Sequence, residues 1–102
     1  MYAYDPLAGV SEDLQDLVIG GECHLWTEQT DAVNLDMVMW PRLAAAGEVL
    51  WSGAKDEFGQ NRSQIEASPR LADMRERLVA KGVKAGPIQV PYCTIHGARC
   101  TL

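Results

Sequence analysis

The sequence predicts an α/β fold, and three segments indicate it. Residues 17–28 open with the apolar run Leu17-Val18-Ile19, which is typical of a strand that is covered on both faces. Residues 41–52 and residues 68–82 have the composition of helices. A strand, a polar loop and a helix make one βα unit, and a single unit cannot cover both faces of its own strand. We therefore expect this strand to need parallel neighbours and covering helices.

Composition places the chain among ordinary globular proteins. It has 102 residues, enough for one small domain, of which 47% are hydrophobic and 23% charged. The net charge of −5 argues against nucleic acid and against an anionic membrane as partners, because both attract clustered Lys and Arg. No apolar run approaches the roughly 18 residues that span a bilayer, and the first residues lack the basic and apolar regions of a secretory signal.

Residues 17–28 comprise the predicted strand and the loop that follows it. Gly20 and Gly21 carry no side chain, so another backbone or a ligand can come close. Trp26 and Glu28 are two residues apart, and in extended chain such side chains point to the same side. An indole face and a carboxylate in one space are how proteins commonly hold a sugar. The alternative from this pattern alone is a core tryptophan beside a solvated glutamate.

Helical segments are expected on both sides of this strand. Ser11 is expected to cap a helix of one or two turns. Residues 36–40 are predicted as a short helical turn that ends because Trp40 precedes proline. The helix over residues 41–52 has Pro41 in its first turn. We expect Trp40 and Trp51 to pack in the core. The predicted apolar face of this helix comprises Leu43, Gly47, Leu50 and Trp51.

The most regular helical pattern covers residues 68–82. Ser68 is expected as its cap and Pro69 as its first residue. Asp73 and Arg77 supply an i,i+4 ion pair on the exposed side. The predicted buried stripe comprises Leu71, Met74 and Leu78, and Gly82 ends the helix.

The three cysteines are unevenly placed. Cys93 and Cys100 are seven residues apart in a loop-like segment, where a disulfide would stabilise the fold by roughly 2–3 kcal/mol. Cys23 is expected to behave as a small apolar residue of the strand. The alternatives are free thiols and a zinc site built on Cys93, His96 and Cys100. Its fourth ligand would have to be Cys23 or His24. We expect neither a metal nor another cofactor.

Asn61 opens the triplet Asn61-Arg62-Ser63, an acceptor pattern for N-glycosylation in a polar stretch that we expect to be exposed. Together with the Cys93 and Cys100 pair, it favours a secreted or lysosome-like setting. The true N-terminus would then lie further upstream, which would account for the missing signal sequence.

Several uncommon residues recur in order and at fixed spacing: Gly20-Gly21-Glu22, Leu25-Trp26-Thr27-Glu28, Asp31, Asn34-Leu35, Trp40-Pro41-Arg42 and Glu48-Val49-Leu50-Trp51-Ser52. Together they resemble the C-terminal end of the β-N-acetylhexosaminidases, the family 20 glycoside hydrolases. The resemblance extends roughly from Tyr2 to Cys100. It implies a (β/α)8 TIM-type barrel whose last strand and site loop are residues 17–28. Residues 41–52 would then be a barrel helix, residues 68–82 the C-terminal helix and residues 83–102 the tail.

The resemblance also implies a reaction and roles. Such enzymes remove terminal non-reducing N-acetylglucosamine or N-acetylgalactosamine from glycans with retention, and the acetamido group of the substrate acts as nucleophile. Trp26 matches the tryptophan that lines the sugar pocket, and Glu28 matches the carboxylate that binds the O4 and O6 hydroxyls. The catalytic Asp-Glu pair of the family has no counterpart, because Asp56-Glu57 lies in a polar linker. We therefore expect a C-terminal fragment that holds no catalytic residue and is inactive alone.

In this interpretation the partners are the rest of the barrel and glycans that end in these amino sugars. The parent enzyme would be secreted, lysosomal or vacuolar, and a dimer is a candidate state. Two alternatives stay open: a non-catalytic amino-sugar-binding module that uses Trp26 and Glu28, and a small helical interaction domain built on residues 69–81. Saturable binding of N-acetylglucosamine would favour the first, and cooperative unfolding of the isolated monomer the second.

Overall fold

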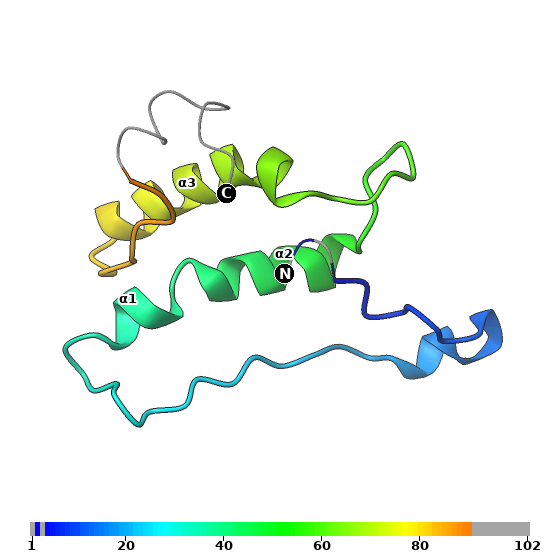
Figure 1. Cartoon of the computed structure of the whole chain (residues 1–102), viewed down its shortest axis with the longest axis horizontal. Helices are drawn as coiled ribbons and strands as arrows, with labels where there is room; N and C mark the ends of the chain where they lie inside the picture. The colour runs from blue at the N-terminus through cyan, green and yellow to red at the C-terminus, as the bar shows by residue number, and fades with distance from the viewer. Residues whose placement is uncertain (1, 3, 91–102) are drawn as a thin grey trace.

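The computed structural model describes residues 2 and 4–90. Its elements, in chain order, are the 3-10 helix η1 (Glu12–Leu17) and the helices α1 (Leu35–Met39), α2 (Arg42–Ser52) and α3 (Gln64–Ala80). Figure 1 shows α1 and α2 in one row, with α3 on one side of them and an extended segment, residues 18–27, on the other. The only β pairing among the described residues is one antiparallel bridge between Lys55 and Asn61.

Residues 18–27 correct the strand prediction. η1 extends to Leu17, so the extended segment starts one residue later than predicted. Within the described ranges this segment pairs with no other strand. A strand forms a ladder only where a neighbouring strand accepts and donates its backbone hydrogen bonds. Here that neighbour is lacking, and Ile19 is 98% exposed. Val18 and Ile19 of the apolar run therefore lie in extended chain as predicted, whereas Leu17 belongs to η1, and the predicted cover is not formed by the described residues.

The helices of the first half begin and end close to the predicted residues. Ser11 precedes η1 as its cap residue, although its side chain makes no capping hydrogen bond. α1 ends at Met39, and its C-cap residue Trp40 has an extended backbone (ψ 140°) ahead of Pro41. Pro41 is the residue before α2, and Gly53 follows the last residue of that helix. Proline and glycine thus end these elements as the sequence indicated.

α3 begins at Gln64, five residues before Pro69, the predicted first residue. The Oγ of Ser63 accepts a hydrogen bond from the backbone N–H of Glu66 at 3.2 Å, so Ser63 rather than Ser68 is the N-cap. A Ser with Glu three residues later is a capping box, and the prediction overlooked it in favour of the Ser68-Pro69 pair. Pro69 therefore lies inside the helix. The hydroxyl of Ser68 donates to the carbonyl of Gln64 at 2.6 Å.

The C-terminal half of α3 follows the prediction. Arg77 Nε donates to Asp73 Oδ2 at 2.7 Å across one turn of the exposed side. The N–H of Val83 reaches the carbonyl of Leu78 at 3.0 Å, and Gly82 between them has a φ of +88°. A Schellman motif requires this left-handed backbone, which glycine adopts without strain. Of the predicted stripe, Leu71 and Leu78 are half-buried, and Met74 is more exposed.

α2 buries a different face from the one predicted. Trp51 is 92% exposed, so the expectation that it packs in the core is wrong, whereas Trp40 is half-buried. The buried residues of α2 are Ala45, Ala46 and Val49. The main core cluster comprises Tyr2, Ala45, Val49 and Ala67, with Leu71 packed against it. Small side chains on this face let α2 and α3 approach closely. The largest side chain of α2, Trp51, consequently lies at the surface.

The core is small for a chain of this length. The accessible surface is 8006 Å², whereas a compact monomer of the same mass exposes about 5,700 Å². The radius of gyration is 15.5 Å, against about 13 Å for a compact domain of 100 residues. In residues 2 and 4–90, no helix combines the length and the apolar character that a bilayer span requires.

The segment after α3 is fastened to the corner between α1 and α2. The N–H of Gly86 donates to the carbonyl of Trp40 at 3.0 Å. Arg75 of α3 donates from Nε to the carbonyl of Ala85 at 3.1 Å. Gly86 is buried, and a Cβ at this position would come 2.6 Å from the carbonyl oxygen of Met37. Glycine is needed here because backbone, not a flexible side chain, occupies the space.

Replacing Gly86 by alanine is expected to lower the free energy of unfolding by about 1–3 kcal/mol, because the new Cβ displaces the α1 backbone. The matched control is Gly47→Ala: Gly47 is exposed inside α2, and no other atom lies within 4 Å of a Cβ there. That change should stabilise the chain by about 0.5–1 kcal/mol. Urea denaturation followed by circular dichroism measures both. Shifts of the same sign for the two variants would contradict this packing.

Candidate functional site

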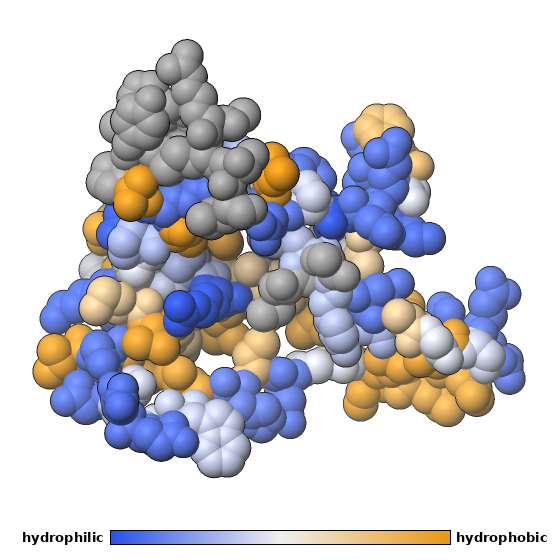
Figure 2. Space-filling view, in the orientation of Figure 1, coloured by the Kyte–Doolittle hydropathy of each residue, from blue (hydrophilic) through white to orange (hydrophobic). Residues whose placement is uncertain are grey.

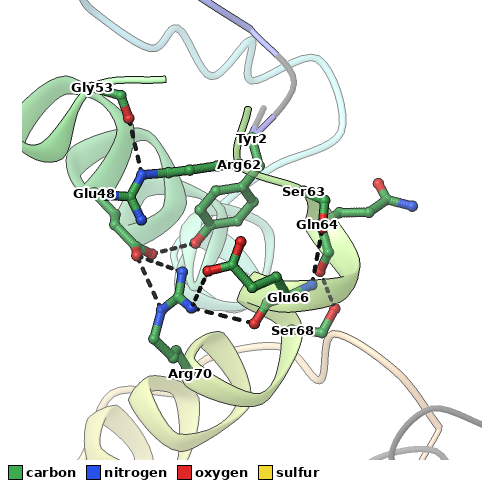
Figure 3. Close-up of polar contacts among 9 residues, drawn as sticks. All are labelled: Tyr2, Glu48, Gly53, Arg62, Ser63, Gln64, Glu66, Ser68 and Arg70. Carbon is green, nitrogen blue, oxygen red and sulfur yellow. Dashed lines mark hydrogen bonds and ion pairs between the residues drawn. The ribbon is translucent and has the colours of Figure 1, made fainter. Parts of the chain in front are cut away.

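A group of polar side chains joins the start of the chain to α2 and α3 (Figure 3). Tyr2 donates from Oη to Glu48 Oε2 at 2.6 Å. Arg70 donates to Glu48 Oε1 from Nη2 at 2.9 Å and from Nε at 3.2 Å. The Nη1 of Arg70 also lies 3.2 Å from Glu66 Oε1. The Glu48 carboxylate is therefore bonded from two segments that are far from it in sequence. We call Tyr2, Glu48 and Arg70 the Glu48 cluster.

Within the Glu48 cluster, the pKa of the carboxyl group is lowered and that of the phenol is raised. Partial burial acts to raise the pKa of the Glu48 carboxyl, but the hydrogen bonds from Tyr2 and Arg70, with the charges of Arg70 and Arg62, lower this pKa overall. Burial, and then the hydrogen bond to Glu48, raise the pKa of the Tyr2 phenol. Glu48 is therefore ionised and Tyr2 neutral near pH 7. The Glu48 carboxylate thus accepts charge-assisted hydrogen bonds that join the start of the chain, α2 and α3.

Replacing Glu48 by glutamine is expected to lower the free energy of unfolding at pH 7 by about 1–3 kcal/mol, because charge-assisted hydrogen bonds are lost. The folded-state pKa of Glu48 is depressed, so its contribution is complete above the ordinary pKa of about 4.3 and is lost as the pH falls through the folded value. The difference between the wild-type chain and Glu48→Gln should thus narrow below about pH 4.

Urea denaturation across a pH series tests this, with Tyr2→Phe as the matched control. That change removes one neutral donor and leaves the carboxylate paired with Arg70, so it should cost about 1 kcal/mol at pH 7. A Glu48→Gln effect of the same size at pH 7 and pH 3 would be inconsistent with an ionised Glu48.

The structure places Trp26 and Glu28 at the surface, at the end of the extended segment. Trp26 is 77% exposed, so it is not a core residue among the described parts of the chain. Glu28 is exposed in a turn, across which the N–H of Thr30 donates to the carbonyl of Thr27 at 3.3 Å. In residues 2 and 4–90, no hydrogen bond or ion pair involves either side chain. Both are thus available to a ligand.

The extended segment rests on α2 at Gly21. A Cβ on Gly21 would lie 3.2 Å from Leu50 Cδ2, so Leu50 packs directly against the glycine backbone. This agrees with the prediction that the glycine pair admits a close neighbour. Leu50 thereby connects the helix that carries Glu48 to the segment that carries Trp26.

Apolar side chains gather at one end of the molecule. Figure 2 shows them over the end that η1 occupies in Figure 1. Leu14 and Leu17 of η1 are exposed there, Leu17 by 73%. Ile19 of the adjoining segment is exposed as well. Contiguous apolar surface of this kind is uncommon on an isolated soluble domain and indicates a contact surface.

The remaining predicted site residues are the glycosylation acceptor Asn61, the cysteines and the histidines. Asn61 is exposed and lies in the 54–62 hairpin, where it forms the β-bridge with Lys55. Cys93, His96 and Cys100 lie outside the described residues.

Cys23 is an exposed free thiol. The expectation that it packs as an apolar residue is wrong, because the extended segment that carries it is uncovered. His24 Nε2 lies 2.9 Å from Glu22 Oε1. Over residues 2 and 4–90, no three His, Cys, Asp or Glu side chains are arranged to hold a metal ion.

The first half of the chain matches a known protein family. Residues 1–54 match the model of the glycosyl hydrolase family 20 catalytic domain, and this range includes Trp26 and Glu28. The chain belongs to glycosyl hydrolase family 20. The catalytic domain of this family is a TIM barrel, so the unpaired residues 18–27 occur in a family whose fold is built on parallel strands.

Known β-hexosaminidases match all or most of the chain. A β-hexosaminidase of Arthroderma benhamiae is 44% identical over 103 residues, which cover 100% of this chain and 16% of that protein. β-Hexosaminidase 1 of Coccidioides posadasii is 39% identical over 102 residues, 100% of this chain and 17% of the relative. The human β-hexosaminidase subunit beta is 42% identical over 90% of the chain and 16% of its own length. The chain thus spans about a sixth of these curated relatives.

Sequence reasoning missed the Glu48 cluster. Its members are 46 and 22 residues apart, and no periodicity connects such distant positions. The available signal was weak: Glu48 stands in a helix otherwise rich in small and apolar residues. A charged side chain among such residues needs a partner, and the fold is required to identify that partner.

Proposed function

We propose that this chain supplies part of the sugar-binding surface of a β-N-acetylhexosaminidase. Trp26 packs its indole against the apolar face of a terminal N-acetylhexosamine, and Glu28 accepts hydrogen bonds from the hydroxyls at the far end of the sugar. The observation that carries this proposal is the 77% exposure of Trp26, two residues before an exposed carboxylate, inside the range that matches the family. An indole left in water loses hydrophobic stabilisation unless something covers it.

We further propose that residues 18–27 form the last strand of a (β/α)8 barrel, with α2 as a barrel helix and α3 as the C-terminal helix. Three observations support this: the unpaired backbone of the segment, the exposed Ile19, and an accessible surface well above that of a compact monomer. Trp26 and Glu28 then follow the carboxyl end of a barrel strand. Barrel enzymes build their active sites at that end.

The chemistry divides between this chain and the rest of the barrel. Bond cleavage with retention, in which the substrate acetamido group is the nucleophile, requires an Asp-Glu pair that other strands supply. Trp26 and Glu28 hold the sugar that this pair acts on. A carboxylate and an indole that contact non-reacting parts of the sugar bind the ground state and the transition state alike, so their main effect is on KM.

The setting of the parent enzyme is part of this proposal. Asn61 is exposed at a hairpin and is open to N-glycosylation, which favours a secreted, lysosomal or vacuolar enzyme. A Cys93–Cys100 disulfide would agree with the same compartment. Both modifications, and a dimeric parent, stay predictions.

A chimera tests the binding roles. This chain replaces the matching 103 residues of the Arthroderma benhamiae relative, and turnover of a chromogenic N-acetylglucosaminide is measured. We expect Trp26→Ala and Glu28→Ala each to lower kcat/KM on the order of 10- to 100-fold, chiefly through KM, because each removes substrate contacts.

The matched controls are Phe58→Ala and Glu57→Ala, an exposed aromatic residue and an exposed acid at the tip of the 54–62 hairpin. These should change kcat/KM by less than about twofold, since surface changes away from a site are close to neutral. If all four variants behaved alike, the sugar-binding role of Trp26 and Glu28 would be excluded.

A further inference from the structure

Two side chains form hydrogen bonds with the backbone beside the turn that carries Glu28, and neither is part of the proposed contact with the sugar. We propose that Asn34 and Asp31 are positioning residues that fix this turn and thereby the carboxylate of Glu28. The inference rests on the proposed function, because a positioning role has meaning only if Glu28 contacts substrate.

With one amide group, Asn34 contacts the backbone at two positions that follow Glu28. Its Nδ2 donates to the carbonyl of Gln29 at 3.0 Å, one residue after Glu28. Its Oδ1 accepts the backbone N–H of Asp31 at 2.9 Å. Donor and acceptor atoms of the same planar group are thus used at once, which sets the distance between the two backbone positions. The backbone that follows Glu28 is therefore fixed to Asn34.

Asp31 secures the second half of the turn. Its Oδ1 accepts the backbone N–H of Val33 at 2.8 Å. Its carbonyl accepts the N–H of Leu35, the first residue of α1, at 3.0 Å. Between them, Asp31 and Asn34 connect the Glu28 turn to the start of a helix.

The capping position of Asn34 shows what its side chain is used for. Asn34 is the N-cap residue of α1, where asparagine ordinarily accepts a hydrogen bond from a backbone N–H of the first helical turn. No such side-chain bond forms at this helix. The amide of Asn34 instead accepts from Asp31 and donates to Gln29, while the Asn34 backbone carbonyl accepts the N–H of Val38 in α1 at 3.1 Å. Asn34 therefore joins the turn to the start of the helix.

The base of this arrangement is itself fixed. Asp36 of α1 accepts the N–H of Lys84 at its Oδ2, 3.2 Å away, and the N–H of Trp40 at its carbonyl, 2.9 Å away. Trp40 in turn accepts from the buried Gly86 at 3.0 Å. The connection therefore runs from Glu28, through Asn34 and α1, to the segment after α3. Binding groups are effective when a scaffold of this kind holds them in place before the ligand arrives.

A double-mutant cycle in the chimera tests the positioning role. Asn34→Ala is expected to lower kcat/KM about tenfold, through a higher KM with kcat nearly unchanged, because Glu28 loses its placement. In a Glu28→Ala background, Asn34→Ala should cause less than a twofold further loss, because the residue through which it acts is gone. Asp31→Ala should behave like Asn34→Ala, whereas Asp31→Asn keeps the Oδ1 acceptor and should restore most of the activity.

Ala32→Ser, an exposed residue of the same loop, is the control and should leave kcat/KM unchanged. Equal losses from Asn34→Ala in both backgrounds would overturn the proposal, since a merely structural role gives additive effects. An unaffected kcat/KM in Asn34→Ala with a large loss in Glu28→Ala would overturn it while leaving the proposed function intact. No loss in Glu28→Ala would overturn both. If Asn34→Ala does not fold, the same cycle built on Asp31→Ala distinguishes these outcomes.

Discussion

The backbone of residues 18–27 sets the constraint on which the rest of this structure depends. Backbone N–H and C=O groups of an extended segment need partners, and none of the described residues pairs with them as a strand. Water satisfies these groups when the segment is exposed, but water cannot compensate the exposure of an apolar run such as Leu17-Val18-Ile19. The catalytic domain of its family is a TIM barrel, and under the proposed function the parallel strands of that barrel pair with this segment and cover it.

The helices of the described chain pack against one another, and α2 contacts this segment. α2 contacts it through Leu50 at Gly21 and contacts α3 through small side chains on its other face. The Glu48 cluster fixes the relative position of α2 and α3 by charge-assisted hydrogen bonds. The segment after α3 then closes on the corner between α1 and α2. The Glu28 turn is exposed, but hydrogen bonds connect it to α1 and, through α1, to the segment after α3.

Residues that act on their own backbone predicted many of the helix ends. Contacts between residues far apart in the sequence could not be predicted. Pro41, Gly53 and Gly82 predicted helix ends correctly, because their effect on the backbone is intrinsic. The start of α3 was missed because two capping signals compete and the Ser63 signal wins. Trp51 was assigned to the core on hydrophobicity alone, which cannot reveal that the covering surface is absent here. For the candidate site, the spacing of Trp26 and Glu28 suggested the sugar-binding role proposed for them, whereas the positioning role proposed for Asn34 came only from its hydrogen bonds.

Under the proposed function, residues 18–27 pair with other strands when the rest of the barrel is present. Hydrogen–deuterium exchange of their amides, compared between the isolated 102-residue chain and the chimera with the Arthroderma benhamiae relative, measures this pairing. We expect rapid exchange in the isolated chain and exchange slowed by about 100-fold or more in the chimera, as for amides of a core strand. Equally rapid exchange in both proteins would contradict this pairing.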